Sequence, residues 1–168
     1  SGDGSAAATP MSLSAAVAAV YANTDTDAIY LKSGDTWSDA DTIVYIEHGG
    51  SLTIGCYVGE ADFDCLGAGT TAIPEHAFPI FDGNYVWSGG THNGWPRDED
   101  SDLVAVADAS MIIVFGSDTT IKELKIEDSG GRGITVAGGS NATVKNVYVD
   151  GAYGGGIIFH TMQGGSCQ

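Results

Sequence analysis

The sequence predicts an all-β fold, a parallel β-helix (solenoid) in which each coil of the chain stacks on the coil before it. The main observation is an internal repeat: residues 117–136 align with residues 140–159 at a constant offset of 23. Ser, Thr, Lys, Gly and Ile recur at identical positions, and apolar positions stay apolar. A repeat of about this length with β-type content is typical of a solenoid that has one coil per repeat.

Each copy of the repeat contains two short strands. In the first copy Leu124 and Ile126 share a face after Ile121, and Ile134 and Val136 share a face in the second strand. Such short alternation indicates half-buried strands. The connections are too short for helical crossovers and are rich in Gly, Ser, Asn and Asp, which form tight turns. Stacked coils would therefore align their Ile, Val and Leu side chains in one buried column.

The only helix that the pattern predicts spans residues 11–22, after a tail at residues 1–10. Ser12 or Ser14 is suited to cap its start,. An apolar stripe follows at Leu13, Val17, Val20 and Tyr21. We expect this helix to cover the open end of the first coil, where strand edges would otherwise be exposed. It is too short to span a membrane, so we expect no membrane insertion.

After the helix, we expect irregular entry coils with long loops over residues 23–102. Regular coils are expected over residues 103–168. Short apolar runs mark the entry strands at 28–31, 43–46, 52–54 and 79–81. Carried backward, the offset of 23 predicts that Ile126, Ile134 and Val136 stack on Leu103, Met111 and Ile113. A β-sandwich could use the same strands, but it would not require the repeat.

Three segments, 28–37, 51–59 and 79–84, resemble the entry coils of the right-handed parallel β-helix proteins of the pectate-lyase-like superfamily, and residues 117–159 resemble its later coils. The resemblance covers about residues 12–160 and implies right-handed coiling. The superfamily includes polysaccharide lyases, polygalacturonases, phage tailspikes and adhesins. The resemblance therefore implies a fold and does not select one activity.

The charge balance limits the possible partners. The chain has 22 acidic and 6 basic residues, for a net charge of −16. Nucleic acid is excluded as an expected partner, because binding phosphates requires Lys and Arg. An acidic polysaccharide would also be repelled overall unless cations intervene. Lys122 and Lys145 stack in register in the two repeats, a ladder that a solvated surface explains well.

Most acidic residues fall in predicted loops, which is typical of a solvated surface that keeps a protein soluble. Clustered carboxylates are also ligands for Ca²⁺. The best metal candidates are Asp98, Asp100 and Asp102, although their spacing matches no EF-hand or nonapeptide motif. Ca²⁺ is thus the one candidate cofactor, and the sequence requires none.

The cysteines indicate a secreted, extracellular chain. Cys56 and Cys65 are close enough in a predicted loop to form a local disulfide,. Cys167 has no evident partner: it is free, pairs with another chain, or pairs with one of the other two cysteines. Asn141, in Asn-Ala-Thr, fits a glycosylation sequon at a predicted turn,.

Lyases of the superfamily resemble one another in using a basic residue as catalytic base and a cation to offset the uronate carboxylate. Arg132, in the turn 129–133, is placed where such an arginine could project. Tyr153 and His160, on the next coil, form a candidate acid–base pair. Alternatively, Tyr153 is a turn aromatic and His160 a strand residue facing water. If the chain is an enzyme, it is a lyase or glycoside hydrolase of this fold.

The segment 85–97 is the best candidate for carbohydrate binding. Its side chains suited to stacking on sugar rings are Tyr85, Trp87, His92 and Trp95,. They could equally fold inward and anchor a long loop over the coils.

After the last predicted strand, near Phe159, neither an amphipathic helix nor a polar capping coil is evident. An uncapped edge is a template for pairing, so either this is a fragment of a longer β-helix or another subunit docks there, end to end, as in a filament. Cys167 could lock such neighbours covalently. We therefore expect an extracellular structural or assembly protein that is associated with glycans. The alternative is a polysaccharide lyase-like carbohydrate-active enzyme, or a fragment of one, that acts on an acidic polysaccharide.

Overall fold

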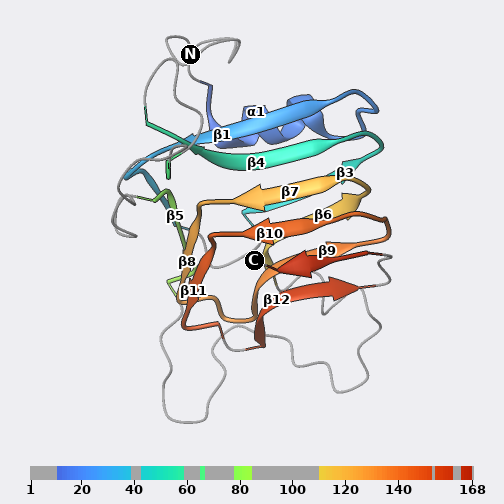
Figure 1. Cartoon of the computed structure of the whole chain (residues 1–168). Coiled ribbons are helices and arrows are strands. Elements are labelled where there is room, and N and C mark those ends of the chain that lie inside the picture. The colour runs from blue at the N-terminus through green and yellow to red at the C-terminus, as the bar shows by residue number, and fades with distance from the viewer. Residues whose placement is uncertain are drawn as a thin grey trace.

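The computed structural model describes residues 11–38, 43–58, 65–66, 78–84, 110–152, 154–160 and 164–167. In these ranges, three parallel sheets and one short helix make an all-β, solenoid-like fold (Figure 1). Sheet A contains β1 (Asp27–Lys32), β4 (Leu52–Tyr57), β7 (Thr119–Lys122), β10 (Thr143–Lys145) and β13 (Ser166–Cys167). Sheet B contains β2 (Thr36–Ser38), β5 (Ile80–Asp82), β8 (Lys125–Glu127) and β11 (Tyr148–Asp150). Sheet C contains β3 (Val44–His48), β6 (Ser110–Gly116), β9 (Arg132–Ala137) and β12 (Gly155–His160).

The chain visits sheets A, B and C in turn and then returns to sheet A, so each strand pairs with its equivalent in the next coil. In the two copies of the repeat, Thr120 pairs with Thr143 and Ile134 with Ile157, in each case 23 positions apart. Earlier coils are less regular, because the segments between β4 and β5 and between β5 and β6 are much longer than the turns of the repeat.

The backward extrapolation of the repeat was wrong by one residue in sheet C. The observed pairs are Ile134 with Ile112, Val136 with Val114, and Ile126 with Phe81. The offset between β6 and β9 is 22, because the turn from β6 to β7 is one residue shorter than the turn from β9 to β10. Met111 and Ile113 are therefore not the partners of Ile134 and Val136. The predicted partner Leu103 lies outside the described residues.

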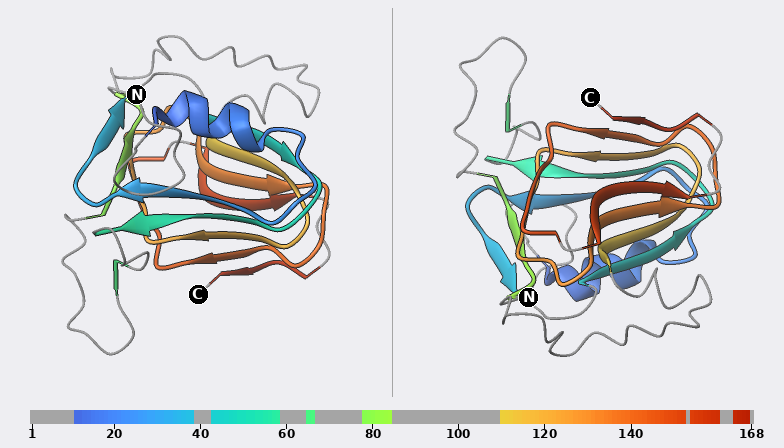
Figure 2. Two further views of the ribbon diagram at one scale, coloured as in Figure 1. Left: turned by 90° about the horizontal axis from the view of Figure 1, so that it is seen from above. Right: turned by 90° about the horizontal axis from the view of Figure 1, so that it is seen from below.

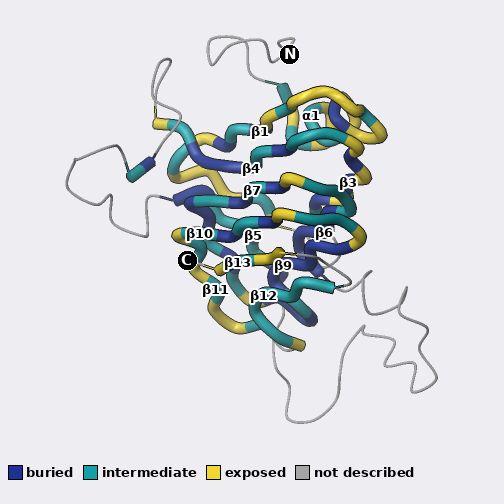
Figure 3. Tube along the Cα trace, turned by 45° about the vertical axis from the view of Figure 1, so that its right-hand side comes forward, coloured by how far each residue is buried: buried dark blue, intermediate teal, exposed yellow. Residues whose placement is uncertain are grey.

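The interior is a column of branched apolar side chains, as the alternation predicted. Successive coils place Ile54, Ile121 and Val144 one above another in sheet A, each at most 1% exposed. In sheet B, Trp37 stacks on Phe81 with a centroid distance of 5.6 Å. Burying one such side chain contributes about 1.5–3 kcal/mol, so this column is the main source of stability. Figure 3 shows the buried strand stretches and the more exposed turns.

Left-handed backbone conformations form the corners of the coils, and they too recur with the repeat. The equivalent positions with positive φ are Asp118, Asn141 and Gly164 at one corner, Glu123 and Asn146 at the next, and Asp128 and Gly151 at the third. Gly, Asn and Asp adopt this conformation at the lowest cost. Glu123 is the exception in this set.

Helix α1 (Leu13–Val20) caps the first coil, which confirms the predicted helix. The Ser12 hydroxyl accepts a hydrogen bond from the Ala15 backbone N–H at 3.2 Å, as an N-cap should,. Val20 is buried in the core, and Leu13 packs against it. Figure 2 shows α1 lying across the end of the stack opposite β12 and β13. Tyr21 departs from the predicted stripe: it is 45% exposed. No helix in the described ranges is long and apolar enough to cross a membrane.

Candidate functional site

The three outer faces differ in chemistry, and sheet A presents hydroxyl groups. Alternation in its strands points Ile54, Ile121 and Val144 inward and leaves the hydroxyl residues in register on the outside: Thr53, Thr120, Thr143 and Ser166,. The Thr143 and Ser166 hydroxyl oxygens are 3.4 Å apart. A row of side-chain hydroxyls therefore follows the stacking direction.

Lysines line the same face. Lys122 and Lys145 are register partners, which confirms their predicted stacking. The Lys122 chain lies over Gly55, where an added Cβ would be 3.1 Å from its Cγ. Lys32, at the end of β1, is exposed. The sequence predicted only the Lys122–Lys145 ladder, because it is the pairing of β1 with β4 that brings Lys32 onto the same face.

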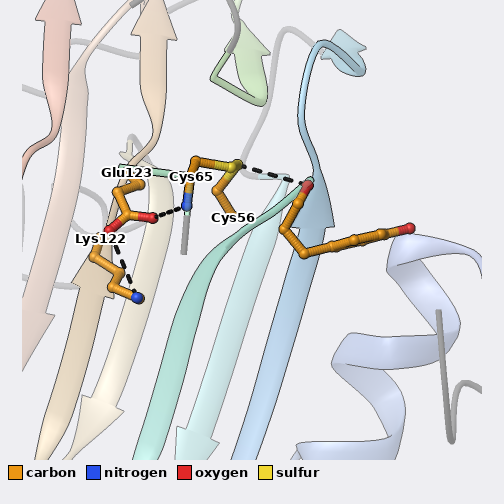
Figure 4. Close-up of a disulfide and its surroundings, with 5 residues drawn as sticks. Cys56, Cys65, Lys122 and Glu123 are labelled. Carbon is orange, nitrogen blue, oxygen red and sulfur yellow. Dashed lines mark hydrogen bonds and ion pairs between the residues drawn. A yellow bond between two sulfur atoms is a disulfide. The ribbon is translucent and has the colours of Figure 1, made fainter. Parts of the chain in front are cut away.

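At the corner between sheets A and B, the predicted disulfide Cys56–Cys65 is confirmed, with the Cα atoms 5.5 Å apart. The bridge packs with Phe78 in a small apolar cluster separate from the main core. Glu123, only 2% exposed, accepts a hydrogen bond from the Cys65 backbone N–H at 2.7 Å (Figure 4). Its other carboxylate oxygen lies 3.5 Å from the Lys122 Nζ.

Sequence reasoning missed Glu123. A signal was present, because Glu123 stands where the second repeat has Asn146, at a corner that requires positive φ. A glutamate at such a position is costly unless its side chain makes compensating contacts. Here the carboxylate holds the Cys65 backbone against the coils.

Sheet B carries carboxylates. Asp82, Glu127 and Asp150 are register partners on its outer side. Lys125 lies 2.6 Å from a Glu127 carboxylate oxygen and 5.4 Å from the centroid of the Tyr148 ring. No group of three or more His, Cys, Asp or Glu side chains within the described ranges has metal-binding geometry. The predicted Ca²⁺ ligands Asp98, Asp100 and Asp102 lie outside those ranges.

Sheet C holds the candidate catalytic residues, but it separates them. Arg132 begins β9 and pairs with Gly155, whereas His160 ends β12 and pairs with Ala137. Five strand positions separate the two register rows, which is roughly 17 Å. Partial burial lowers the pKa of the Arg132 guanidinium from its usual value. Arg132 and His160 are therefore not brought together, and Tyr153 lies outside the described residues.

Aromatic rings form a row beside these strands. The Tyr21 and Tyr45 rings stack with their centroids 6.3 Å apart, and the Phe115 ring is 5.8 Å from Tyr45. The Tyr45 hydroxyl donates a hydrogen bond to Glu47 at 2.9 Å. The predicted sugar-binding residues Tyr85, Trp87, His92 and Trp95 lie outside the described ranges.

A histidine–aspartate pair, formed by the buried His48 and the half-buried Asp27, is structural. The His48 Nε2 atom is 3.1 Å from an Asp27 carboxylate oxygen, and the His48 Nδ1 atom accepts the Gly50 N–H at 3.1 Å. Asn23 donates to the same Asp27 oxygen at 2.6 Å. Both imidazole nitrogens are thus engaged in holding the turn into β4, and neither is available for acid–base catalysis. No sequence spacing indicated this pair.

Two further predicted positions lie near the sheet A edge. Asn141 is exposed, as an acceptor of a glycan must be, and its side-chain amide donates to Asp118 at 3.0 Å. Cys167, in β13, is exposed and carries a free thiol. Its pairing with Cys56 or Cys65 is excluded, because those two pair with each other.

No protein family, no curated protein and no solved structure matches this chain.

Proposed function

We propose that this protein is an extracellular structural β-helix that self-associates through the coil edge formed by β11, β12 and β13. The observation that carries this proposal is the sheet order. Within the described chain, each of these three strands is the last of its sheet and pairs on one side only. Unpaired strand edges bind other strands readily.

The side chains at this edge also support its role as the surface of self-association. Ile157 and Phe159 in β12 are only partly buried, whereas their register partners Ile134 and Val136 are completely buried. The sequence is equally apolar in both coils, so the difference arises because no further strand pairs with β12 in the described part of the chain. A second apolar edge placed there would bury these side chains and contribute the usual hydrophobic free energy.

The opposite end of the stack argues for a closed dimer instead of the filament that the sequence suggested. A head-to-tail contact would bring the β12 edge against α1, whose apolar side already packs on the core. Two β12 edges, in contrast, are self-complementary about a twofold axis, which gives an isologous and closed contact. The exposed Cys167 in β13 would then lie near its symmetry mate.

The proposal extends to the location of the protein and to its family. The Cys56–Cys65 disulfide is compatible with an oxidising compartment, which supports secretion,. We propose that the secreted protein associates with extracellular glycans. We also propose that the coils are right-handed, with a period of about 23 in the regular part, and that the chain belongs with the pectate-lyase-like β-helices. The separation of Arg132 from His160 gives the lyase alternative no support.

Light scattering over a concentration series tests the proposal. We expect a particle of twice the 17.2 kDa chain mass, and a disulfide-linked dimer on non-reducing electrophoresis. Cys167→Ser should abolish the link and keep the non-covalent dimer. Ile157→Lys at the edge should give monomers, whereas the matched change Val58→Lys, at an exposed position away from the edge, should not.

A monomer at every concentration would overturn the proposal. So would large particles or filaments in negative-stain electron microscopy that persist in the Ile157→Lys variant. Because Ile157→Lys could disturb the last coil, the wild-type concentration series and Cys167→Ser keep the test decisive.

A further inference from the structure

Two exposed tyrosines meet where helix α1 joins the first coil. The Tyr21 and Tyr45 rings stack with their centroids 6.3 Å apart and an angle of 28° between their planes. Tyr21 is 45% exposed and Tyr45 is 39% exposed, so both phenol rings are accessible from solution. This pair lies at the end of the stack opposite β12 and β13 (Figure 2).

The backbone fixes the positions from which the two side chains extend. Tyr21 is the C-cap of α1, and the next residue, Ala22, donates its N–H to the Glu47 carbonyl oxygen at 2.6 Å. This bond ties the end of the helix to β3, two residues after Tyr45. On the neighbouring strand β6, the Phe115 ring lies 5.8 Å from the Tyr45 ring. Tyr45 therefore contacts one ring that carries a hydroxyl and one that does not.

Tyr45 also has a proton acceptor within hydrogen-bonding distance. Its hydroxyl donates to a Glu47 carboxylate oxygen at 2.9 Å, because residues two apart in a strand share a face,. A phenol that loses an electron releases its hydroxyl proton readily, and a positioned carboxylate assists that transfer. The contact with Glu47 thus favours one-electron oxidation of Tyr45.

We propose that Tyr21 and Tyr45 form an oxidative modification site, where hydrogen peroxide acting through a haem peroxidase couples the two rings into a dityrosine within one chain. Each phenol loses one electron and one proton and becomes a phenoxyl radical, and the Tyr45 proton passes to Glu47 and then to water. One ortho ring carbon of each radical joins in a new carbon–carbon bond. The hydrogens on these two carbons move to the phenolic oxygens. The peroxide takes up the two electrons and two protons and becomes two water molecules.

The product would fasten the helical cap to the coils. Helix α1 packs on the core through its apolar side chains, and the new bond would close the chain covalently between residues 21 and 45. A cross-link of this kind restricts the unfolded chain and so raises stability. The inference goes beyond the proposed self-association and does not require it, because the tyrosine pair and the β12 edge lie at opposite ends of the stack.

Treating the purified full chain with hydrogen peroxide and a haem peroxidase tests the inference, with dityrosine fluorescence and tryptic peptide mapping as readouts. Trypsin cleaves after Lys32 and Arg97, so the cross-link should join peptides 1–32 and 33–97 with the loss of two hydrogen atoms. On electrophoresis with reductant, the product should keep the mass of one chain, 17.2 kDa. The thermal midpoint should rise by about 5–10 °C.

Three kinds of variant locate the reaction. Tyr21→Phe and Tyr45→Phe each keep the ring and remove the hydroxyl, so each should abolish the linked peptides and the rise in the thermal midpoint. Tyr148→Phe is the matched control, because Tyr148 is 42% exposed and its ring lies over Lys125; it should leave both readouts unchanged. Glu47→Gln should slow coupling about tenfold through loss of the proton acceptor.

Absence of the linked peptides 1–32 and 33–97 in the treated wild type would overturn the inference. So would linked peptides that persist in Tyr21→Phe or Tyr45→Phe, or a dityrosine that joins two chains. An unchanged coupling rate in Glu47→Gln would overturn the role assigned to Glu47.

Discussion

Replacing the buried Glu123 by alanine should destabilise the protein, because the Cys56–Cys65 disulfide loses the side chain that anchors it to the coils. The wild-type carboxylate accepts the Cys65 N–H at 2.7 Å and lies 3.5 Å from the Lys122 ammonium group. Alanine removes both contacts and leaves the Cys65 N–H without this acceptor. Glutamine at the same position keeps the length and one acceptor oxygen but loses the charge.

The magnitude follows from burial. A hydrogen bond to a charged group contributes about 1.5–3 kcal/mol, and losing it at a buried site costs a similar amount. The Lys122 side chain is 13% exposed, so its ion pair is only partly screened. We expect Glu123→Ala to lower the free energy of unfolding by about 2–3 kcal/mol and Glu123→Gln by about 1 kcal/mol. Both variants keep a residue that disfavours positive φ, so their difference isolates the side-chain contacts.

Urea unfolding followed by far-ultraviolet circular dichroism measures both variants. In thermal unfolding, Glu123→Ala should lower the midpoint by about 5–10 °C, since each kcal/mol is worth roughly 2–4 °C at this chain length. In a Cys56→Ser/Cys65→Ser background, Glu123→Ala should lower the free energy of unfolding by less, because the disulfide that Glu123 anchors is already absent.

Equal destabilisation by Glu123→Ala and Glu123→Gln would refute the anchoring role. Strict additivity with the disulfide variant would do the same, because residues that share one structural unit should show a coupling energy of at least about 0.5 kcal/mol.

Three further changes test the packing of the coils, each by chemical denaturation. Replacing Cys56 and Cys65 by serine should lower stability by about 2–3 kcal/mol through loss of loop closure; an unchanged midpoint would show that the bridge is dispensable. Thr119→Val should raise stability by about 1 kcal/mol, because the buried Thr119 hydroxyl has no hydrogen-bond partner in the described structure,; a lower midpoint would contradict this. Gly139→Ala should lower the free energy of unfolding by about 3 kcal/mol, because a Cβ there would overlap the backbone of the preceding coil,. Gly34→Ala, in open space at φ +81°, should cost only about 1 kcal/mol, and equal effects would refute the close approach at Gly139.

Local patterns predicted the fold where the repeat is regular. The alternation around Ile121, Ile126 and Ile134 identified the buried column, because side chains in a strand alternate between two faces whatever the rest of the chain does,. The N-cap at Ser12 and the Cys56–Cys65 bridge were likewise predictable, since each depends on residues close in sequence.

The candidate sites were less predictable, because they depend on register between coils. Arg132 and His160 were predicted as catalytic candidates on successive coils, and the pairing places them at opposite ends of sheet C. Glu123 and Cys65 meet across 58 positions of sequence, and no local pattern encodes that contact.

The sequence by itself determined the stacked coils, the apolar column, the helix over the first coil and the overall acidity. Each follows from residue type and spacing along the chain. Only the tertiary structure decided the pairing of β6 with β9, the buried Glu123 contact and the gathering of Lys32, Lys122 and Lys145 on one sheet. The reason is that the lengths of turns and of longer segments differ from coil to coil. The register is therefore not set by the repeat alone, and packing of the whole core decides which positions meet.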